Sequence, residues 1–563
     1  MSRYQAYLPE IILIGAGLAM RLAFAALPLQ SLLVLLEDDA WMVAAIARHW
    51  ALGHGITADG SNPTNGFHPL YPLTFGALPY LFKPNDLDFG FRANLLICAF
   101  LSGLALLPFY GLARLLAARP IALAALAVLA LNPLFIRVSV NAMETSLALL
   151  LLLTLWWYAL AHPPNDLPGA ALLGVLAALT ALARLDSLIA AALLGLALLW
   201  REVWARRWPA LSATYGAVAA LLLLPYFARN WLVFGAISPS SGRALAYLHS
   251  YRESFAFSSG LQLVATQPAL DLSWAPLWLW LLTILLLALM IWRMTPQRRA
   301  MLTPLIVYAL ALTGYYSYIQ QQGQPRYYVG VGIVLMLIIC AWAGGAQPTD
   351  AALPARSTLF SRLGIAQAAW LIALAAIVLN NAMFVRQFDL AAGAPGLAQP
   401  AMYQAARWIA TNLPPDAQLA SSNSGIFQYY SDHVVLNFDG KLNHEIIPIQ
   451  VRRELDIYLR SKGIGYIIDL PEVADRIVFY SRSMSEAKPH IEITAIQKIQ
   501  IYIQMIAHKV GLAAAVQLDE LKPDRVLRPF SAVTTDVQQF PLPNDPARAV
   551  VLYQLNDNFG KQP

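Results

Sequence analysis

Charged residues are scarce in this chain. Asp, Glu, Lys and Arg make up 12% of its 563 residues and hydrophobic residues make up 58%, whereas soluble domains carry roughly 25% charged residues. The mean hydropathy is +0.54. We therefore expect a polytopic protein that lies in a lipid bilayer. The formal charge of +6 does not indicate nucleic-acid binding, because arginines that orient a membrane protein give the same excess.

Cysteine is almost absent as well. The two cysteines, Cys98 and Cys340, lie in apolar runs, so we expect no disulfide framework, and the cysteines do not indicate the redox compartment. No small-residue cleavage site follows the first apolar run, which we therefore interpret as a retained helix rather than a signal peptide. The C-terminal region contains neither a GxGxxG motif nor a Walker loop, which argues against a nucleotide site there.

Long hydrophobic runs, in contrast, are abundant. A spanning helix needs about 20 apolar residues, and the sequence predicts about eleven such helices, an odd number that puts the two termini on opposite sides of the membrane. The predicted spans are 9–36, 93–113, 121–138, 145–161, 169–183, 187–200, 210–233, 274–292, 303–319, 327–345 and 363–385.

The arginines predict the orientation of these spans. With a cytoplasmic N-terminus, four inside loops hold clustered arginines and the outside turns hold mostly isolated ones, as the positive-inside rule expects. All candidate site residues named below then lie on the outside face. The clustered arginines are Arg114, Arg119, Arg201, Arg206, Arg207, Arg293, Arg298, Arg299, Arg356 and Arg362.

The predicted membrane domain covers residues 1–390 and contains two long outside loops. These loops are residues 37–92 and 234–273, and the first is expected to form short helices at Ala40–Leu52 and Leu70–Phe82. A linker from Gly393 to Pro400 leads to a predicted extracytoplasmic α/β domain at residues 398–563. Its expected elements are a helix at Met402–Asn412 and strands at Gln418–Ser422, Val434–Asn437 and Tyr466–Asp469.

Three consecutive carboxylates, Glu37, Asp38 and Asp39, follow the first span. A charge cluster at the bilayer surface is costly to hold unless it has a function. Adjacent carboxylates disfavour one another's ionisation, which moves one pKa towards the range of a general base. In the structural alternative, Asp39 is a helix N-cap and Glu37 a solvated residue. Glu144, at the outer start of the fourth span, either joins this site or favours a helix N-terminus through the dipole.

Four basic residues of the outside face are candidates for binding an anion. Arg326 is the only cation in an outside turn of glutamines, and a guanidinium binds phosphate through two hydrogen bonds. Arg184 stands at an outer helix boundary, where Asp186 is an alternative partner for it. His68 is either a pH-dependent donor or a structural histidine, and Arg243 lies in the second outside loop.

Several of these segments resemble the GT-C glycosyltransferases, integral-membrane enzymes that take sugars from polyprenyl-phosphate carriers. The order of the motifs and their one-sided topology, from the first span to Asn443, make the resemblance specific. The matching segments are Glu37-Asp38-Asp39-Ala40-Trp41, Asn62-Pro63-Thr64-Asn65-Gly66-Phe67-His68-Pro69, Met143-Glu144-Thr145, Arg184-Leu185-Asp186, Arg326-Tyr327-Tyr328 and Asp439-Gly440-Lys441-Leu442-Asn443.

The resemblance implies an inverting transfer of a sugar from a polyprenyl-phosphate donor to a hydroxyl group, with Asp38 as the general base. The implied acceptor is an envelope glycan or glycolipid on the extracytoplasmic face of a bacterial plasma membrane. By resemblance, the catalytic residues are Asp38, Asp39 and Glu144, the donor phosphate ligands are Arg326, His68, Arg184 and Arg243, and the acceptor or donor sugar contacts are Asn65, Tyr327, Asp439 and Asn443.

Metal dependence differs among GT-C enzymes, so Mg²⁺ or Mn²⁺ remains open here. Hard carboxylates suit these ions, and Asp39 and Glu144 are the ligands expected if a metal binds. The His68 loop and the Met-Glu-Thr segment resemble bacterial envelope enzymes, including arabinofuranosyl transferases, more than protein mannosyltransferases. In the related aminoarabinose transferases a Lys occupies a place similar to that of His68.

A lipid-linked-sugar transporter or flippase and a protein O-glycosyltransferase are the alternative functions. Ionisable residues at mid-membrane depth are rare, with Arg21 the notable one, and the sequence shows neither a broken-helix pair nor an inverted repeat. These features argue against transport. A non-catalytic scaffold would not need the three consecutive carboxylates.

Overall fold

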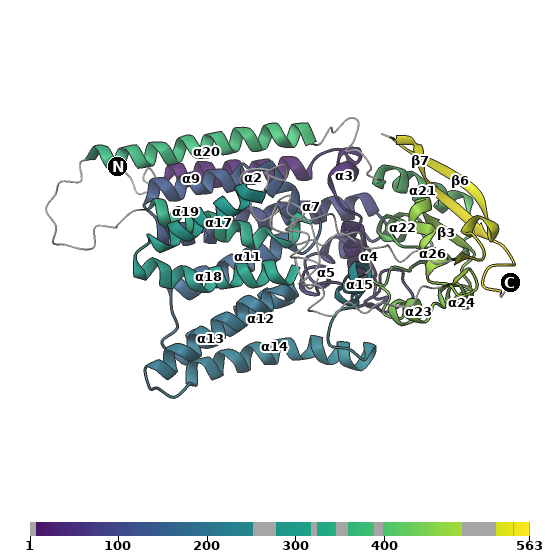
Figure 1. Cartoon of the computed structure of the whole chain (residues 1–563), viewed down its shortest axis with the longest axis horizontal. Helices are drawn as coiled ribbons and strands as arrows, with labels where there is room; N and C mark the ends of the chain where they lie inside the picture. Colours follow the sequence, from purple (N-terminus) through teal and green to yellow (C-terminus); the bar gives the residue numbers. More distant parts are fainter. Residues whose placement is uncertain are drawn as a thin grey trace.

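The computed structural model describes residues 7–250, 277–316, 324–344, 359–387, 398–486, 525–543 and 545–561. Its long helices run side by side along the long axis, and an α/β domain stands at one end of this helical bundle (Figure 1). Residues 251–273 of the second predicted outside loop lie outside the described residues, as does the predicted linker from Gly393 to residue 397.

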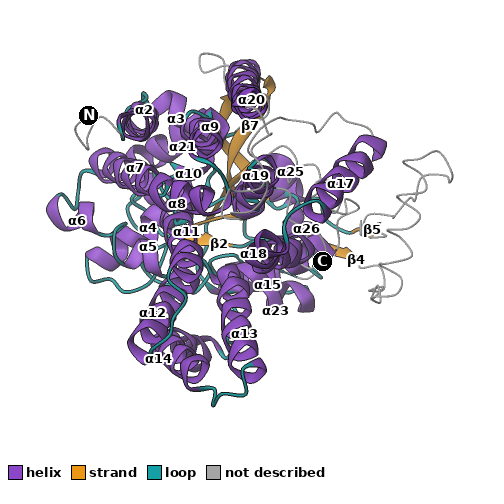
Figure 2. Cartoon of the chain, turned by 90° about the vertical axis from the view of Figure 1, so that its left-hand side faces the viewer, coloured by secondary structure: helices purple, strands orange, loops and turns teal. Residues whose placement is uncertain are grey.

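The helices of the bundle follow the apolar runs of the sequence. They are α2 (Leu8–Ala25), α3 (Leu29–Leu35), α7 (Leu87–Leu104), α8 (Leu106–Leu116), α9 (Arg119–Ala130), α10 (Pro133–Ser139), α11 (Thr145–Ala161), α12 (Leu167–Ala183), α13 (Leu188–Trp204), α14 (Ala210–Phe234), α17 (Leu277–Trp292), α18 (Pro296–Gly314), α19 (Val329–Ala343) and α20 (Leu359–Gln387). Figure 2 looks along the bundle and shows α12, α13 and α14 as a group that projects from the rest.

Each predicted span overlaps one of these helices or two consecutive ones. Within the described ranges, four helical segments are long and apolar enough to cross a membrane, namely Leu8–Ala25, Leu87–Leu116, Leu185–Trp204 and Ala210–Phe234. The polytopic helical architecture is therefore confirmed, and the number eleven stays a prediction. The first predicted span is interrupted, because Pro28 disfavours the helical conformation in the residue before it and separates α2 from α3.

One predicted span is a broken helix pair, which the sequence had not revealed. The run 121–138 forms α9 and α10, which are bent by 63°. Pro133 stops α9, and the Asn132 carboxamide oxygen accepts a hydrogen bond from the Leu134 N–H at 3.0 Å to start α10. Arg21 caps the C-terminal end of α9, since its Nη1 donates a hydrogen bond to the Ala130 carbonyl oxygen at 2.9 Å. The intramembrane charge of Arg21 thus has a structural partner.

The basic turns and the α/β domain lie at opposite ends of the bundle. The turn between α13 and α14, which carries Arg206 and Arg207, is at the end far from the α/β domain (Figure 1). This arrangement agrees with clustered arginines on one side of a membrane and the predicted site on the other. Which side faces the cytoplasm stays a prediction.

The α/β domain has a mixed sheet with the strand order β2-β1-β3-β7-β6. β1, β2 and β3 are parallel, and β7 is antiparallel to both β3 and β6. Its elements are α21 (Gln399–Asn412), β1 (Leu419–Ser421), α22 (Gly425–Tyr430), β2 (Val435–Asn437), α23 (Ile446–Arg452), α24 (Leu455–Ser461), β3 (Tyr466–Asp469), α25 (Pro471–Ala474), α26 (Arg476–Phe479), β6 (Thr534–Leu542) and β7 (Asp545–Leu555).

The helix and the three strands predicted in this domain are confirmed to within a few residues. The β6–β7 hairpin was not predicted, because β6 is mostly polar and exposed and lacks the alternation that marks a half-buried strand. The sheet therefore combines the three parallel strands β1, β2 and β3, which the sequence predicts as strands, with the antiparallel hairpin β6–β7, which it does not predict.

The first outside loop contributes α4 (Asp39–Ala51), α5 (Leu70–Leu73) and α6 (Leu78–Phe82), and the second contributes α15 (Ser240–Ser250). α4 confirms one predicted helix. The other prediction, Leu70–Phe82, divides into α5 and α6 because Thr74, with φ −122° and ψ −94°, leaves the helical region. The residues that follow the carboxyl ends of the parallel strands β1 and β2 contact the first outside loop, so these ends of the strands face the bundle.

Candidate active site

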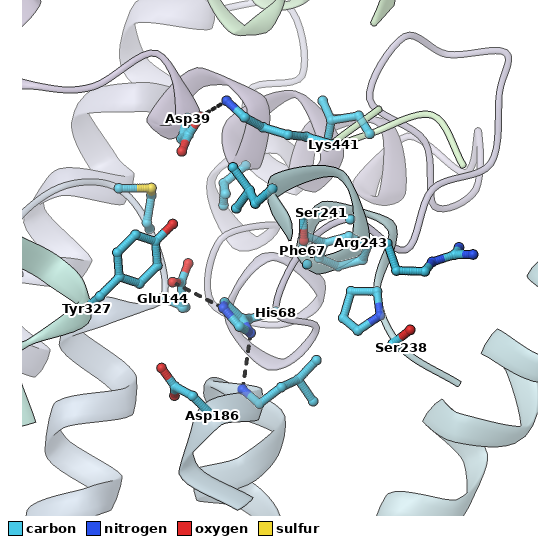
Figure 3. A pocket seen from close by; sticks show the side chains of 18 of the residues that line it. Asp39, Phe67, His68, Glu144, Asp186, Ser238, Ser241, Arg243, Tyr327 and Lys441 are labelled. Carbon is cyan, nitrogen blue, oxygen red and sulfur yellow. Dashed lines mark hydrogen bonds and ion pairs between the residues drawn. The ribbon is translucent and has the colours of Figure 1, made fainter. Parts of the chain in front are cut away.

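A cavity of about 820 Å³ lies where the bundle meets the α/β domain (Figure 3). Its walls come from α4, the loop around His68, the residues before α11, the junction of α12 and α13, the ends of α14 and α18, α15, the residues before α19 and the loop after β2. Segments from nearly the whole chain therefore meet at one place. The acidic and basic residues that line the cavity are Asp39, His68, Glu144, Asp186, Arg243, Arg326 and Lys441.

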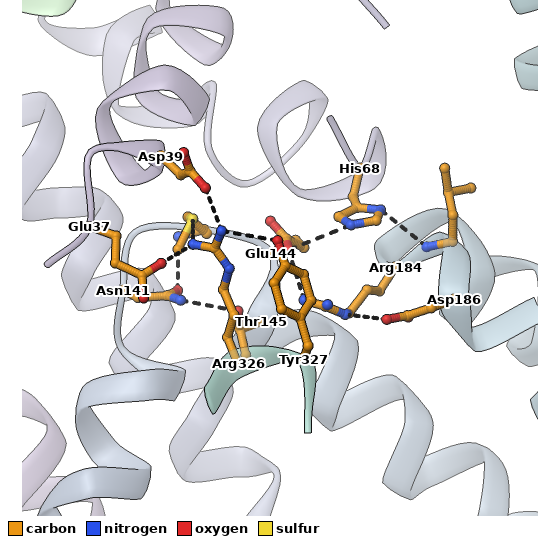
Figure 4. Close-up of polar contacts among 12 residues, drawn as sticks. Glu37, Asp39, His68, Asn141, Glu144, Thr145, Arg184, Asp186, Arg326 and Tyr327 are labelled. Carbon is orange, nitrogen blue, oxygen red and sulfur yellow. Dashed lines mark hydrogen bonds and ion pairs between the residues drawn. The ribbon is translucent and has the colours of Figure 1, made fainter. Parts of the chain in front are cut away.

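Arg326 lies between two of the three consecutive carboxylates. Its guanidinium forms ion pairs with Glu37 and with Asp39 (Figure 4). It comes from the short η3 turn (Pro325–Tyr327) and is only 8% exposed. The one cation of this turn thus stabilises two acids, which explains how a chain this apolar holds the Glu37-Asp38-Asp39 cluster.

Arg184 forms the second group of ion pairs. Its Nη1 is 3.2 Å from Glu144 Oε1, and its Nε is 2.9 Å from Asp186 Oδ2. The Tyr327 ring joins both groups, since the guanidinium carbons of Arg184 and Arg326 are each 5.1 Å from its centroid. The structural alternative for Arg184, pairing with Asp186, is therefore confirmed, and Glu144 is an additional partner.

Lys441 is a charged residue of the cavity that sequence reasoning missed. It follows β2 in the α/β domain, and its Nζ lies 3.6 Å from Asp39 Oδ1 and 3.4 Å from Asp439 Oδ2. The sequence placed it in a turn after Asp439-Gly440, and its position within a matched motif was the only signal available. Asp439, a predicted sugar contact, pairs with Lys441 instead of lining the cavity.

Asp38 and Asp39 are adjacent in sequence but have different partners. Asp39 lines the cavity, whereas the carboxylate of Asp38 accepts hydrogen bonds from the backbone N–H groups of Gly425 and Ile426, both at 2.9 Å. Burial raises the pKa of Asp38 to about 7, although those two N–H groups lower it. Burial also raises the pKa of Asp39, but Lys441 and Arg326 outweigh this effect and hold that pKa below its usual range.

Asp38→Asn is expected to remove part of the pH dependence of stability. A carboxyl group whose pKa rises from 3.8 to about 7 on folding binds more protons in the folded state, so its contribution to stability falls as the pH rises from about 4 to about 7. The wild type should therefore lose more thermal stability than Asp38→Asn between pH 5 and pH 8. Thermal unfolding in one detergent at both pH values measures this, and parallel changes in the two proteins would contradict it.

His68 is held as a neutral hydrogen-bond donor. Its Nδ1 accepts a hydrogen bond from the Leu185 N–H at 3.1 Å, so the ring proton is on Nε2, which lies 3.9 Å from Glu144 Oε1. Burial lowers the pKa of His68, and Glu144 only partly offsets this. The sequence left His68 as either a pH-dependent donor or a structural histidine, and in the structure Nδ1 is engaged by the backbone while Nε2 keeps an N–H that can donate.

The remaining predicted residues divide between the cavity and its surroundings. Arg243 and Tyr327 line the cavity. The Asn65 carboxamide oxygen instead accepts from the Ser240 N–H at 3.1 Å, which joins the two outside loops. The Asn443 amide donates to the Tyr458 hydroxyl group at 3.0 Å inside the α/β domain. The positions of Asn65 and Asn443 indicate that they support the cavity wall.

The carboxylates of the cavity do not by themselves form a metal site. Within the part of the chain that the structure describes, no three His, Cys, Asp or Glu residues are grouped so as to hold a metal ion. Asp39 and Glu144, the ligands expected for Mg²⁺ or Mn²⁺, are each paired with an arginine. These two acids therefore do not fit a Mg²⁺ or Mn²⁺ site in this arrangement.

Comparisons with known proteins identify the fold. Residues 395–515 match a family model described as a domain of unknown function (DUF8728). No curated protein matches the chain by sequence. The apo crystal structure of the oligosaccharyltransferase from Archaeoglobus fulgidus is similar over 86% of this chain and 74% of that chain, with 14% identity and a TM-score of 0.57.

Two further solved structures are similar to the chain. The same oligosaccharyltransferase, AglB, in complex with an inhibitory peptide and a dolichol-phosphate, matches 86% of this chain and 73% of that chain, with 14% identity and a TM-score of 0.56. ArnT from Cupriavidus metallidurans, bound to undecaprenyl phosphate, matches 95% of this chain and 97% of that chain, with 14% identity and a TM-score of 0.49.

Proposed function

Because the chain has the GT-C fold, which it shares with the archaeal oligosaccharyltransferase, we propose that it transfers a sugar from a polyprenyl-phosphate donor to a hydroxyl group. The observation that carries this proposal is the row of ion pairs in the cavity between the bundle and the α/β domain, where carboxylates and guanidinium groups alternate. Such a row brings together a proton acceptor and cations, and sugar transfer from a phosphate needs both.

In the proposed reaction, the acceptor oxygen attacks the anomeric carbon on the face opposite the phosphate, so that the configuration inverts. The hydroxyl proton passes to a carboxylate, the bond between the anomeric carbon and the phosphate oxygen breaks, and polyprenyl phosphate leaves. We assign the proton acceptor to Asp39, because its side chain lines the cavity. Asp38, which the resemblance favours as the base, binds α22 and is proposed to hold Asp39 in position.

The donor phosphate is proposed to bind at Arg243. Its Nε and Nη2 are buried and have no hydrogen-bond partner among the described residues, whereas Arg326 and Arg184 each bind two carboxylates. Arg243 and Asp39 lie on opposite sides of the cavity in Figure 3. Phe227 and Trp231 of α14 line the same cavity, and Trp231 is 60% exposed. This apolar wall reaches the outer face of α14 and suits a prenyl tail.

The proposed acceptor is a hydroxyl group of an envelope glycan or glycolipid on the extracytoplasmic face of a bacterial plasma membrane, and the sugar is a pentose or a hexose. This part of the proposal follows the sequence resemblance to envelope enzymes. The segments that line the cavity, among them α4 and α15, lie at the end of the bundle next to the α/β domain (Figure 1). That position supports transfer rather than transport, because transporter sites lie near the middle of the membrane.

Purified protein in detergent, offered a panel of polyprenyl-phosphate sugars with glycan and glycolipid acceptors, tests this function. Transfer of one sugar by the wild type, retained by the exposed-acid control Asp416→Asn, is the expected result. Protein that remains folded and binds polyprenyl phosphate but transfers no sugar to any acceptor would overturn the proposal.

Arg243→Ala is expected to weaken the binding of polyprenyl phosphate by about tenfold to a hundredfold, because a hydrogen bond to a charged group contributes roughly 1.5–3 kcal/mol. Titration of the detergent-solubilised protein with a short-chain polyprenyl phosphate measures this. Arg207→Ala, the same substitution at the far end of the bundle, is the matched control. Equal affinities of the two variants would place the phosphate elsewhere.

A further inference from the structure

The loop that follows β2, residues Phe438 to Asn443, is held between two segments of the membrane domain, α15 and the first outside loop. The Lys441 carbonyl oxygen accepts a hydrogen bond from the Ser240 hydroxyl group of α15 at 2.8 Å. Gly66 of the first outside loop packs so closely that a Cβ there would lie 1.7 Å from the same oxygen. Gly440, with φ +85°, provides the left-handed turn that brings Lys441 into this position.

A second contact between the domains lies beside this loop. The Asp38 carboxylate binds the first two N–H groups of α22, and a Cβ on Gly425 would lie 2.3 Å from the Asp38 carbonyl oxygen. Two glycines, Gly66 and Gly425, thus allow the two domains to approach closely on either side of Asp39. The position of Lys441 relative to Asp39 is therefore fixed by backbone contacts, not only by its flexible side chain.

The charges around Asp39 require a cation besides Arg326. Arg326 is shared between Glu37 and Asp39, so one positive charge faces two carboxylates. Lys441 Nζ approaches Asp39 at 3.6 Å from the side of the α/β domain, and the Asp39 side chain is 25% exposed. Without Lys441, the acid that faces the cavity would be both partly buried and incompletely neutralised, which favours its protonated form.

We infer that Lys441 is a positioning residue of the active site, supplied by the α/β domain, which holds Asp39 ionised and directed into the cavity. The inference rests on the proposed transfer function and deepens it, since the membrane domain then depends on the docked α/β domain for its working acid. A proton acceptor must be ionised before the acceptor hydroxyl arrives. Lys441 fulfils this condition through its ion pair with Asp39.

The pH dependence of sugar transfer tests this inference. Lys441→Met is expected to shift the acidic limb of the kcat profile upward by about 1 to 3 pH units, because an opposite charge at this range lowers a carboxyl pKa by that amount. Lys441→Arg, which keeps the positive charge, should return the acidic limb of the kcat profile to its wild-type position. Lys462→Met is the matched control, since Lys462 belongs to the same domain but pairs with Glu445 at 3.2 Å.

Asp439→Asn separates a charge effect from a packing effect. This variant removes the competing partner of Lys441, so its acidic limb should stay in place or move to lower pH, opposite to Lys441→Met. If Lys441→Met does not fold, Lys441→Gln takes its place in the comparison. If the acidic limb of the kcat profile stays in place in Lys441→Met or Lys441→Gln, or if the charge-retaining Lys441→Arg does not keep it at its wild-type position, the inference is overturned. Absence of transfer by the wild type would instead overturn the proposed function.

Discussion

Asp39→Asn is expected to lower kcat by about 10²–10⁴-fold, the usual contribution of a general base, with little change in thermal stability. Asp39 lines the cavity between Arg326 and Lys441, and the asparagine retains its size but cannot accept a proton. Both cations keep a carboxylate partner in the variant, Glu37 for Arg326 and Asp439 for Lys441. Folding should therefore be preserved, and turnover measured with saturating donor should show the loss.

Asp38→Asn is the variant to compare with Asp39→Asn, because it tests which of the two acids is the base. If Asp38 only holds α4 against α22, its substitution should lower turnover much less than Asp39→Asn and should act mainly on stability. Asp416→Asn, at an exposed position of the α/β domain, controls for the loss of one carboxylate. A fully active Asp39→Asn together with an inactive Asp38→Asn would return the base to Asp38, as the resemblance implied.

Arg184→Met is expected to destabilise the protein by about 3–5 kcal/mol, the cost of breaking a buried ion pair from one side. Arg184 is 7% exposed and binds both Glu144 and Asp186, so its loss leaves two buried carboxylates without a cation. The Tyr327 ring also loses one of its two guanidinium contacts. Denaturant or thermal unfolding in one detergent measures the effect.

The triple variant Arg184→Met, Glu144→Gln, Asp186→Asn is the control for this interpretation. It removes the cation together with both acids, and replacing a whole buried charge group is often close to neutral. We expect it to regain most of the lost stability but not the transfer activity. Arg207→Met, in the exposed basic turn, should match the wild type. A single Arg184→Met variant as stable as the wild type would show that these ion pairs do not support the fold.

The GT-C resemblance is confirmed at the level of the fold. The motifs around Glu37, Glu144, Arg184 and Arg326 contributed to this, because each places a charged residue beside a predicted helix end. Arg326 was identified as the single cation of its turn, and Glu144 and Arg184 as charges at helix boundaries. These positions depend on where apolar runs begin and end, and hydropathy alone shows that.

Lys441 and the broken α9–α10 pair show what escapes such reasoning. Besides the local Asp439, Lys441 pairs with Asp39, a residue of the other domain, and nothing local marks this contact. The break before Pro133 lies inside a continuous apolar run, and its stabilisation by Arg21 comes from another helix. In both cases the decisive interaction joins segments that are far apart in the chain.

By itself, the sequence determined that this is a polytopic membrane protein with acids and arginines gathered near predicted helix ends, since composition and hydropathy depend only on which residues follow one another. The tertiary structure decided which of the acids lines the cavity and which basic residue there has nitrogen atoms without a hydrogen-bond partner among the described residues. Asp38 and Asp39 have different partners because one side chain faces α22 and the other faces Arg326 and Lys441. The contacts of Asp38 with α22 and of Asp39 with Lys441 form only after the α/β domain has docked on the bundle.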